Sequence, residues 1–381
     1  MNRGSLVLAI LMLVSGCAAA FAVNEGSPDR GIRVLIADGQ PSVKLTVLGG
    51  YRVVDSDTGK ILSDSRNLSG VRVRALPKGI SIAGVRFPAR VHVYSDVPAD
   101  LFVNDLPFRG HITLQRISDE NLMVVNTVDV EEYLYGVLFH EVGSWWPMEA
   151  LKAQAVASRT YALYQKKERT GKPFDVYNNQ SSQMYGGAGS ERGRSSDAVD
   201  ATRGEVMTYE EKIFPTFFHA TCGGVTRNAS ELWNIDLPPL RGGVECSSCW
   251  FSPHYSWKTD VGLRELEDLL TERGVWRGEI TALLPGVVSP SGHLLDVVIQ
   301  GPVQSKTILV KDLRLWVGPT VIRSEKFELS QSRGRINFVG RGWGHAVGMC
   351  QWGALGQAIV RKRYDEILEF YYPGSKLTKL Y

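Results

Sequence analysis

The chain has 381 residues, which is enough for about two or three domains of ordinary size. Its residues are 44% hydrophobic and 22% charged, and this composition excludes a largely disordered or fibrous protein. The formal net charge is +3, and no basic block or tail accompanies it, so the composition gives no support for nucleic acid as a partner.

The first segment, Met1–Ala22, has the pattern of a secretory signal peptide: Arg3 supplies the positive end, and an apolar run too short to span a membrane follows at Leu6–Val14. Two processing sites compete. Residues 20–22 form an A-x-A cleavage site, whereas Val-Ser-Gly before Cys17 resembles a bacterial lipobox, in which Cys17 would carry a lipid anchor. Either reading predicts export to the periplasm or cell envelope.

The next region, residues 33–126, alternates apolar and polar residues in short runs that Gly-, Pro- and Asp-rich turns separate. The apolar runs are Val34–Ile36, Val43–Leu48, Val71–Ala75, Val91–Tyr94 and Leu122–Val125. This pattern predicts a β-rich N-terminal domain, built as a small sandwich or barrel.

Helical patterns begin at Asp129. Helical spacing of apolar residues predicts a helix over Val130–Val142. A second helix is predicted after it, with Ser144 as a cap, Pro147 in the first turn and Gly171 beyond its end. A stripe of small residues within this helix allows another backbone to approach closely: Ala150, Ala153, Ala157 and Thr160.

The remaining chain mixes helices and strands, so the predicted fold class is α+β. Residues 178–189 form a loop-rich stretch, and residues 257–337 are expected to form a smaller inserted α/β subdomain. The predicted helices are Ser195–Thr202, Leu263–Arg273 and Ala354–Arg363, with Asp365–Tyr372 closing the domain. The predicted strands are Val206–Tyr209, Ile213–His219, Leu294–Ile299 and Thr307–Val310.

Two close pairs of nitrogen or sulfur ligands predict a metal site. His219 and Cys222 are followed, 24 positions after Cys222, by the pair Cys246 and Cys249. Two such pairs on separate segments fit a tetrahedral, structural zinc site, in which His254 can replace one ligand. A disulfide between Cys222 and Cys246 is the alternative in an oxidising compartment, and a redox pair formed by Cys246 and Cys249 lacks a βαβ context.

Several familiar catalytic motifs are incomplete. His140 begins a zincin-like H-E-x-x-H pattern, but Ser144 stands where the second histidine is required. The glycine-rich residues 340–344 fail as a dinucleotide fingerprint because His345 occupies the final glycine position. Cys350 lies five residues after His345, and we interpret it as a small hydrophobic residue in preference to a nucleophile.

Glu141 is the candidate catalytic residue. It ends a hydrophobic helix beside Trp145 and Trp146, and an apolar setting disfavours the charged carboxylate and so raises its pKa. A carboxyl with a raised pKa can donate a proton to a glycosidic oxygen near neutral pH. The alternative is that Glu141 forms a cap or a salt bridge at the helix end.

Four segments in a fixed order (130–166, 181–187, 218–233 and 340–358) resemble the stage II sporulation protein D / LytB family. The resemblance covers residues 129–372, and the β-rich region is similar to an extra domain of some members. It implies a lytic transglycosylase that cleaves the glycan strands of peptidoglycan, with Glu141 as its catalytic acid. Zinc bound after the F-H motif of some members is similarly implied for His219 and Cys222, and more loosely for Cys246 and Cys249.

The resemblance also implies substrate contacts. Gln183 and Tyr185 match a segment near the cleft of the family, and His345 matches its G-H-G-V-G-M turn, in which this chain has Ala346 for a glycine. Trp145 and Trp146 offer aromatic surfaces that suit sugar rings.

Ordinary glycosidases need two carboxylates, but a lytic transglycosylase needs one, because the 6-hydroxyl of the N-acetylmuramyl residue attacks its own C1. Two rival functions remain open. One is a non-catalytic wall-binding enhancer of a separate amidase, and the other is a structural lipoprotein scaffold anchored through Cys17.

Overall fold

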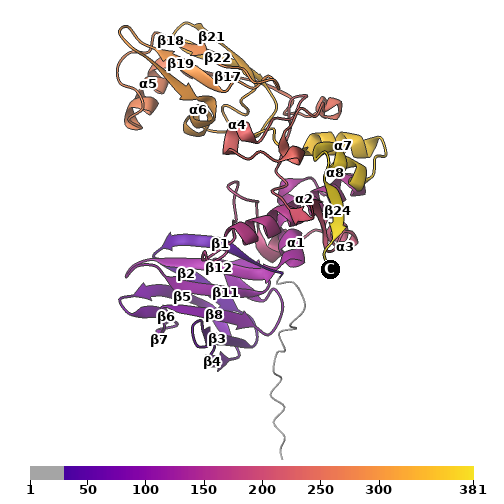
Figure 1. Cartoon of the computed structure of the whole chain (residues 1–381). Coiled ribbons are helices and arrows are strands. Elements are labelled where there is room, and N and C mark those ends of the chain that lie inside the picture. The colour runs from indigo at the N-terminus through magenta and orange to yellow at the C-terminus, as the bar shows by residue number, and fades with distance from the viewer. Residues whose placement is uncertain (1–29) are drawn as a thin grey trace, which may run out of the picture.

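The computed structural model describes residues 30–381, so the predicted signal peptide and both processing sites lie outside the described residues. The architecture is mixed α+β, in agreement with the predicted class. In Figure 1 two sheets lie at the bottom of the view, most helices lie in the middle, and a second group of sheets lies at the top.

Two sheets pack face to face at the N-terminal end. The first consists of β1 (Gly31–Gln40), β3 (Tyr51–Asp55), β4 (Ile61–Ser65), β8 (Arg90–Ser95), β11 (His111–Arg116), β12 (Leu122–Asp129) and β13 (Val176–Tyr177). The second consists of β2 (Ser42–Val47), β5 (Leu68–Leu76), β6 (Gly79–Ile82), β7 (Val85–Phe87), β9 (Leu101–Val103) and β10 (Leu106–Phe108). Their strand orders are β13-β1-β12-β11-β8-β3-β4 and β10-β9-β2-β5-β6-β7.

Alternation along the strands places their apolar residues between the two sheets. In β2, for example, Val43, Leu45 and Val47 are buried, whereas Lys44 is exposed. Burial of one face of each sheet in a shared core is the arrangement of a β-sandwich, one of the two architectures that the alternating pattern predicts.

The chain leaves this sandwich directly into a helix. The helix α1 (Val130–Glu141) follows β12 without a loop, and the Asp129 carboxylate caps it by accepting a hydrogen bond from Glu131 N at 2.9 Å. The helix α2 (Met148–Glu168) begins after Pro147 and packs against α1. Its small residues Ala150, Ala153 and Ala157 are buried, as the stripe predicts.

Shorter elements surround α2. They are α3 (Gly193–Ala201), β14 (Glu205–Tyr209), β15 (Lys212–Ile213), α7 (Gln351–Ile359), α8 (Tyr364–Tyr371) and β24 (Lys376–Lys379). Beside them β16 (Phe218–His219) pairs in parallel with β23 (Met349–Cys350), and a single turn, α4 (Ser230–Trp233), follows. The β16–β23 pair joins segments about 130 residues apart in the sequence and so brings Cys350 close to Cys222.

A separate hydrophobic core lies in residues 257–338. Its elements are β17 (Ser256–Gly262), α5 (Leu263–Glu272), β18 (Ala282–Pro285), β19 (Asp296–Gln300), β20 (Ser305–Leu309), α6 (Val310–Val317), β21 (Phe327–Ser332) and β22 (Arg335–Arg341). They form two three-stranded sheets, β17-β22-β21 and β18-β19-β20.

The predicted elements differ from the structure in several places. The N-cap of α2 is Pro147 and not the predicted Ser144, and no side chain caps this helix. The strand predicted over Ile213–His219 is interrupted, because Pro215 lacks a backbone N–H and its carbonyl accepts a turn hydrogen bond from Phe217 N. The final helix pair begins earlier than predicted, since α7 starts at Gln351. The helix α6 was not predicted, because it follows β20 with no loop to separate the two patterns.

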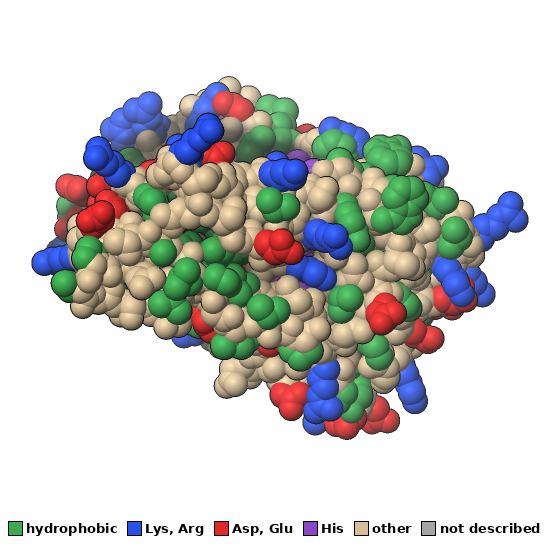
Figure 2. Space-filling model, turned by 90° about the horizontal axis from the view of Figure 1, so that it is seen from above, with side chains coloured by type: hydrophobic (Ala, Val, Ile, Leu, Met, Phe, Trp, Pro, Cys, Tyr) green, Lys and Arg blue, Asp and Glu red, His purple; other side chains and the backbone are tan. Residues whose placement is uncertain are grey.

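Basic and acidic side chains are interspersed on the face seen in Figure 2, with hydrophobic side chains between them. Within residues 30–381 no helix is both long enough and apolar enough to cross a membrane.

Candidate active site

Glu141 is the last residue of α1 and is half-buried. Its Oε1 accepts a hydrogen bond from the backbone N–H of Met184 at 3.0 Å, and the side chain of Gln351 also hydrogen-bonds its carboxyl group. Burial raises the pKa of Glu141 to about 7, even though these two donors act in the opposite direction. The carboxyl is therefore partly protonated near neutral pH, as a general acid requires.

Three glutamine side chains near this carboxyl are linked by hydrogen bonds. Gln351 Nε2 donates to Gln154 Oε1 at 3.4 Å, and Gln154 Nε2 donates to Ser158 Oγ at 3.0 Å. The carbonyl of Ser158 accepts a hydrogen bond from Gln183 Nε2 at 3.3 Å. The acid thus lies at one end of a buried network of neutral polar groups that joins α2, α7 and the loop before α3.

Three of the five predicted substrate-binding residues are buried, and two of these three lie in the loop before α3. Gln183 is 1% exposed and accepts a hydrogen bond from Tyr133 OH, whereas Tyr185 is 6% exposed and donates to Asn126 Oδ1 at 2.8 Å. Neither side chain has a surface that a substrate reaches in this structure. This corrects the expectation of direct contact: both residues fix the loop whose Met184 N–H reaches Glu141.

The two adjacent tryptophans differ in exposure. Trp145 is 68% exposed, whereas Trp146 is 5% exposed and packs edge-on against Trp352 with ring centroids 5.7 Å apart. Both indole nitrogens lie close to Gly143, where an added Cβ would come within about 3 Å of each. Trp145 therefore offers an exposed aromatic face three residues after Val142, the neighbour of the acid, and Trp146 packs edge-on against it.

His345 lies in a different aromatic group. Its ring packs against Trp233 with centroids 5.0 Å apart and against His219 at 5.5 Å, and its Nδ1 accepts a hydrogen bond from Val347 N. Burial lowers the pKa of His345 well below its ordinary value, so the ring is neutral.

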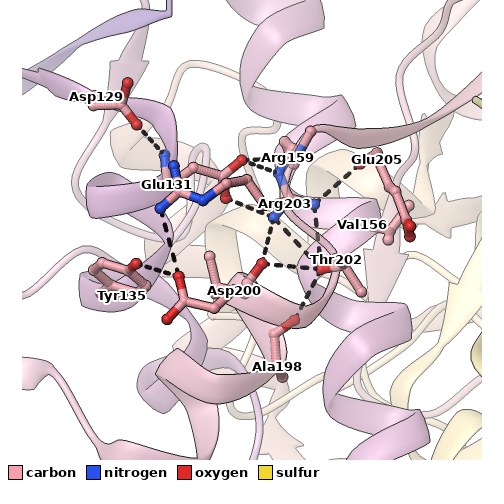
Figure 3. Close-up of polar contacts among 12 residues, drawn as sticks. Asp129, Glu131, Tyr135, Val156, Arg159, Ala198, Asp200, Thr202, Arg203 and Glu205 are labelled. Carbon is pink, nitrogen blue, oxygen red and sulfur yellow. Dashed lines mark hydrogen bonds and ion pairs between the residues drawn. The ribbon is translucent and has the colours of Figure 1, made fainter. Parts of the chain in front are cut away.

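The acidic residues near Glu141 in sequence have other partners. Figure 3 shows Glu131 bound to Arg159, an ion pair at 2.7 Å whose side chains are 1% and 0% exposed. Glu132 lies 3.7 Å from Arg109, and Glu149 binds Lys152 and the backbone N–H of Tyr364. None of these three carboxylates is free to act as a second catalytic group beside Glu141.

Four buried cysteines converge at one point: the Sγ atoms of Cys222, Cys246, Cys249 and Cys350 lie within 4.8 Å of one another. All four are free thiols, and the Sγ atoms of Cys222 and Cys249 are 3.7 Å apart. Tetrahedral zinc with Zn–S bonds of about 2.3 Å needs sulfur atoms about 3.8 Å apart, so the spacing fits the metal. A site with four thiolates would be closed and structural.

The cluster differs from the predicted ligand set, because Cys350 takes the place of His219. The Nδ1 atom of His219 lies 3.1 Å from the carbonyl oxygen of Val347, and its Nε2 is buried without a hydrogen-bond partner among the described residues. His254 does not join the cluster either, since its ring packs edge-on against Trp343.

Sequence reasoning missed Cys350 and Gln351. Both follow a glycine-rich turn whose role depends on the pairing of β16 with β23. The nearest local signal is an N-cap pattern, in which Cys350 Sγ accepts a hydrogen bond from Gly353 N at the start of α7.

Comparison with known proteins gives a consistent set of relatives. A family model described as "SpoIID: Stage II sporulation protein" matches residues 118–209. A stage II sporulation protein D of Bacillus amyloliquefaciens is 31% identical over 276 residues, which cover 67% of this chain and 76% of that protein. An uncharacterized protein of Brachyspira hyodysenteriae is 33% identical over 357 residues, 91% of this chain and 92% of that protein.

An amidase enhancer of Bacillus subtilis is 27% identical over 293 residues. The match covers 64% of this chain and 40% of the enhancer, so the chain spans less than half of that relative's length.

Proposed function

The chain belongs to the SpoIID family of stage II sporulation proteins, and from this premise we propose that it is a lytic transglycosylase that cleaves peptidoglycan glycan strands. The observation that carries the proposal is the setting of Glu141. It is a half-buried carboxyl that only neutral donors contact, and its pKa is raised to about 7.

The proposed reaction uses this one carboxyl twice. Protonated Glu141 donates its proton to the glycosidic oxygen as the bond from that oxygen to C1 of the N-acetylmuramyl residue breaks. The 6-hydroxyl of the same residue forms the new bond to C1, and the Glu141 carboxylate takes the hydroxyl proton. The products are a shortened strand and a 1,6-anhydromuramyl end, and the acid returns to its starting state.

The partners of the neighbouring acidic residues support a mechanism with one carboxylate. Hydrolysis by a pair of carboxylates would require a second group on the opposite side of the bond. Glu131, Glu132 and Glu149 are each engaged by a cation, whereas Glu141 is not. An intramolecular hydroxyl removes the need for such a group, since its tether supplies proximity.

Trp145 is the proposed contact for a sugar ring. Its side chain is exposed and lies close to the acid in sequence, and an aromatic face with a polar N–H suits a ring that has both apolar and hydroxyl-bearing surfaces.

The rival proposal is that the chain stimulates a separate cell-wall amidase without cleaving glycan itself. The similarity to an amidase enhancer favours it. It predicts that Glu141 is dispensable.

The deciding experiment compares the mature protein with Glu141→Gln on intact and on peptide-stripped peptidoglycan, with products identified by mass spectrometry. We expect 1,6-anhydromuramyl ends from the wild type and a loss of about 100-fold or more in rate for Glu141→Gln. Glu149→Gln is the matched control, because this carboxylate is also at a helix end but is paired with Lys152. Reducing ends would contradict the mechanism, and absence of cleavage would favour the enhancer.

We further propose that zinc occupies the cluster of Cys222, Cys246, Cys249 and Cys350 as a structural ion. Bound zinc would neutralise four thiolates and tie the segments on both sides of α4 to the start of α7. Cys222→Ser is expected to lose the metal and to lower the melting temperature. Metal analysis of the purified wild type is the direct measurement, and absence of zinc would contradict the assignment.

The signal-like N-terminus leads us to propose that the protein acts in the periplasm or cell envelope, with a lipid anchor if Cys17 is modified. Release of Cys17→Ser from membranes would support the anchor, and unchanged fractionation would favour cleavage after Ala22.

A further inference from the structure

We propose that Gln351 is a positioning residue for Glu141 and that the four-cysteine cluster holds Gln351 in place. Metal occupancy would then govern the acid as well as the stability of the fold. The inference rests on the proposed function, because it deepens the role of the same acid. It is carried by the contacts on the two sides of the first turn of α7.

On one side, the first turn of α7 is built on a cluster sulfur. Cys350 immediately precedes Gln351 and caps the helix, and its Sγ accepts hydrogen bonds from Gly353 N at 3.3 Å and Cys222 N at 3.4 Å. The helix N-terminus thus faces a sulfur that metal binding would hold as a thiolate, an arrangement that the helix dipole favours.

The body of α7 lies directly against the segment that carries two further cluster cysteines. A Cβ added at Gly353 would lie 2.5 Å from Cys246 Sγ, and one added at Gly356 would lie 2.2 Å from the carbonyl oxygen of Ser248. Only glycine leaves room for this approach. A displacement of Cys246–Cys249 would therefore displace the helix and with it the Gln351 side chain.

On the other side, the Gln351 amide is oriented toward the acid. Gln154 Nε2 donates to Ser158 Oγ, so Gln154 Oε1 is left to accept from Gln351 Nε2. An amide nitrogen carries two hydrogens, and the hydrogen bond to Gln154 leaves one for the Glu141 carboxyl, which the Gln351 side chain contacts. Gln351 is 7% exposed, so water does not readily replace it.

This contact serves the acid in both of its states. A donor to the carboxyl restricts its rotation, and it stabilises the carboxylate that remains after proton donation. The titratable groups that face Glu141 are Tyr133 of α1 and Tyr161 of α2, and burial raises the pKa of both, so they are neutral at pH 7. Gln351 and Met184 N–H are thus the groups whose loss would raise the pKa of Glu141.

A double-mutant cycle tests the link. The variants are Gln351→Leu, Cys249→Ser and the two combined, each of the mature chain. Cys249 is chosen because it is distant in sequence from α7 and Glu141. The pKa of Glu141 is followed by ¹³C NMR of labelled glutamate, assigned by the signal that Glu141→Gln removes, and kcat and KM are measured on peptidoglycan.

We expect Gln351→Leu to raise the pKa of Glu141 by about one unit and to lower kcat about tenfold with little change in KM. Cys249→Ser should have the same effects, and the double variant should be no worse than either single variant. Gln351→Leu should keep the visible absorption of a Co²⁺-substituted thiolate site, which shows that the cluster itself is intact. Gln357→Leu, a buried glutamine of the same helix, is the matched control and should change none of these quantities.

If Cys249→Ser fails to fold, removal of metal from the wild type by a chelator, followed by its return, replaces that arm of the cycle. The inference would be overturned if the double variant lost the product of the two single-variant losses in kcat. It would also be overturned if metal removal left the pKa of Glu141 unchanged. Failure of the wild type to cleave glycan would overturn the proposed function instead. The NMR titration would still decide whether the cluster and Gln351 govern the acid.

Discussion

Helix α1 carries a buried glutamate at its start and a half-buried glutamate at its end, and the partners of the two carboxyl groups differ in charge. Glu131 in the first turn receives two hydrogen bonds from Arg159, one from Gly204 N and one from Tyr381 OH. Glu141 in the last turn receives only neutral donors. A full cationic partner makes the first carboxylate a fixed part of the fold, whereas neutral donors leave the second able to exchange a proton.

The difference also follows from helix polarity. Carboxylates are stabilised near a helix N-terminus and destabilised near a C-terminus, so the position of Glu141 adds to the burial that raises its pKa. One short helix therefore holds an ion-paired carboxylate and a carboxyl group with a raised pKa about ten residues apart, and their environments differ accordingly.

The largest effect on stability is expected from a substitution of Glu131, at the start of α1. Glu131→Gln leaves Arg159 buried without its counter-charge and should lower the free energy of unfolding by about 3–5 kcal/mol. Urea denaturation at pH 7 is the measurement. Glu132→Gln is the control, because this half-buried residue lies at the rim near Arg109 and should cost less than about 1 kcal/mol. Equal losses of unfolding free energy in the two variants would contradict a special structural role for Glu131.

The Glu141 end of the helix should change stability in the opposite direction. The folded protein holds the Glu141 proton more tightly than the unfolded chain does, so stability is full below the ordinary pKa of 4.5 and declines as the pH rises toward about 7. Glu141→Gln removes this penalty and should stabilise the protein at pH 8 by about 2 kcal/mol, with little gain at pH 4. A stability gain that is independent of pH would argue against a raised pKa.

The smallest expected effect comes from giving Glu141 a cationic neighbour, as Glu131 already has in Arg159. Met184 is partly exposed and its N–H contacts Glu141, so Met184→Lys brings a cation near the carboxyl. The pKa of Glu141 should fall by about one unit, and the alkaline limb of the pH–rate profile should move down with it. Met184→Leu is the neutral control. An unchanged profile in Met184→Lys would mean that the cation stays in solvent.

The sequence predicted well those features that depend on local pattern. Helical spacing located α1 and α2, and alternation located the sandwich strands, because both signals are read over a few residues. The environment of Glu141 was also inferred locally, from the apolar helix and the adjacent tryptophans. Its neutral partners, Met184 and Gln351, come from distant segments and have no local signal.

The four-cysteine cluster shows the same limit. Cys222, Cys246 and Cys249 are close enough in sequence for their spacing to indicate a metal site, and His219 was the nearest fourth candidate. Cys350 lies about 100 residues later and joins the others only through the pairing of β16 with β23. Gln183 and Tyr185 show a further limit: a motif identifies residues near a site without telling which of them face it.

The hydrogen bond from Tyr381 to Glu131 spans 250 positions and joins the end of the chain to the start of α1. The strand β24 just before Tyr381 also completes the small sheet beside α2 by pairing with β14. Residues 376–381 thus cover one edge of the sheet beside α2 and supply a donor to the buried ion pair of Glu131 and Arg159, so their removal would expose that edge and leave Glu131 with one donor fewer.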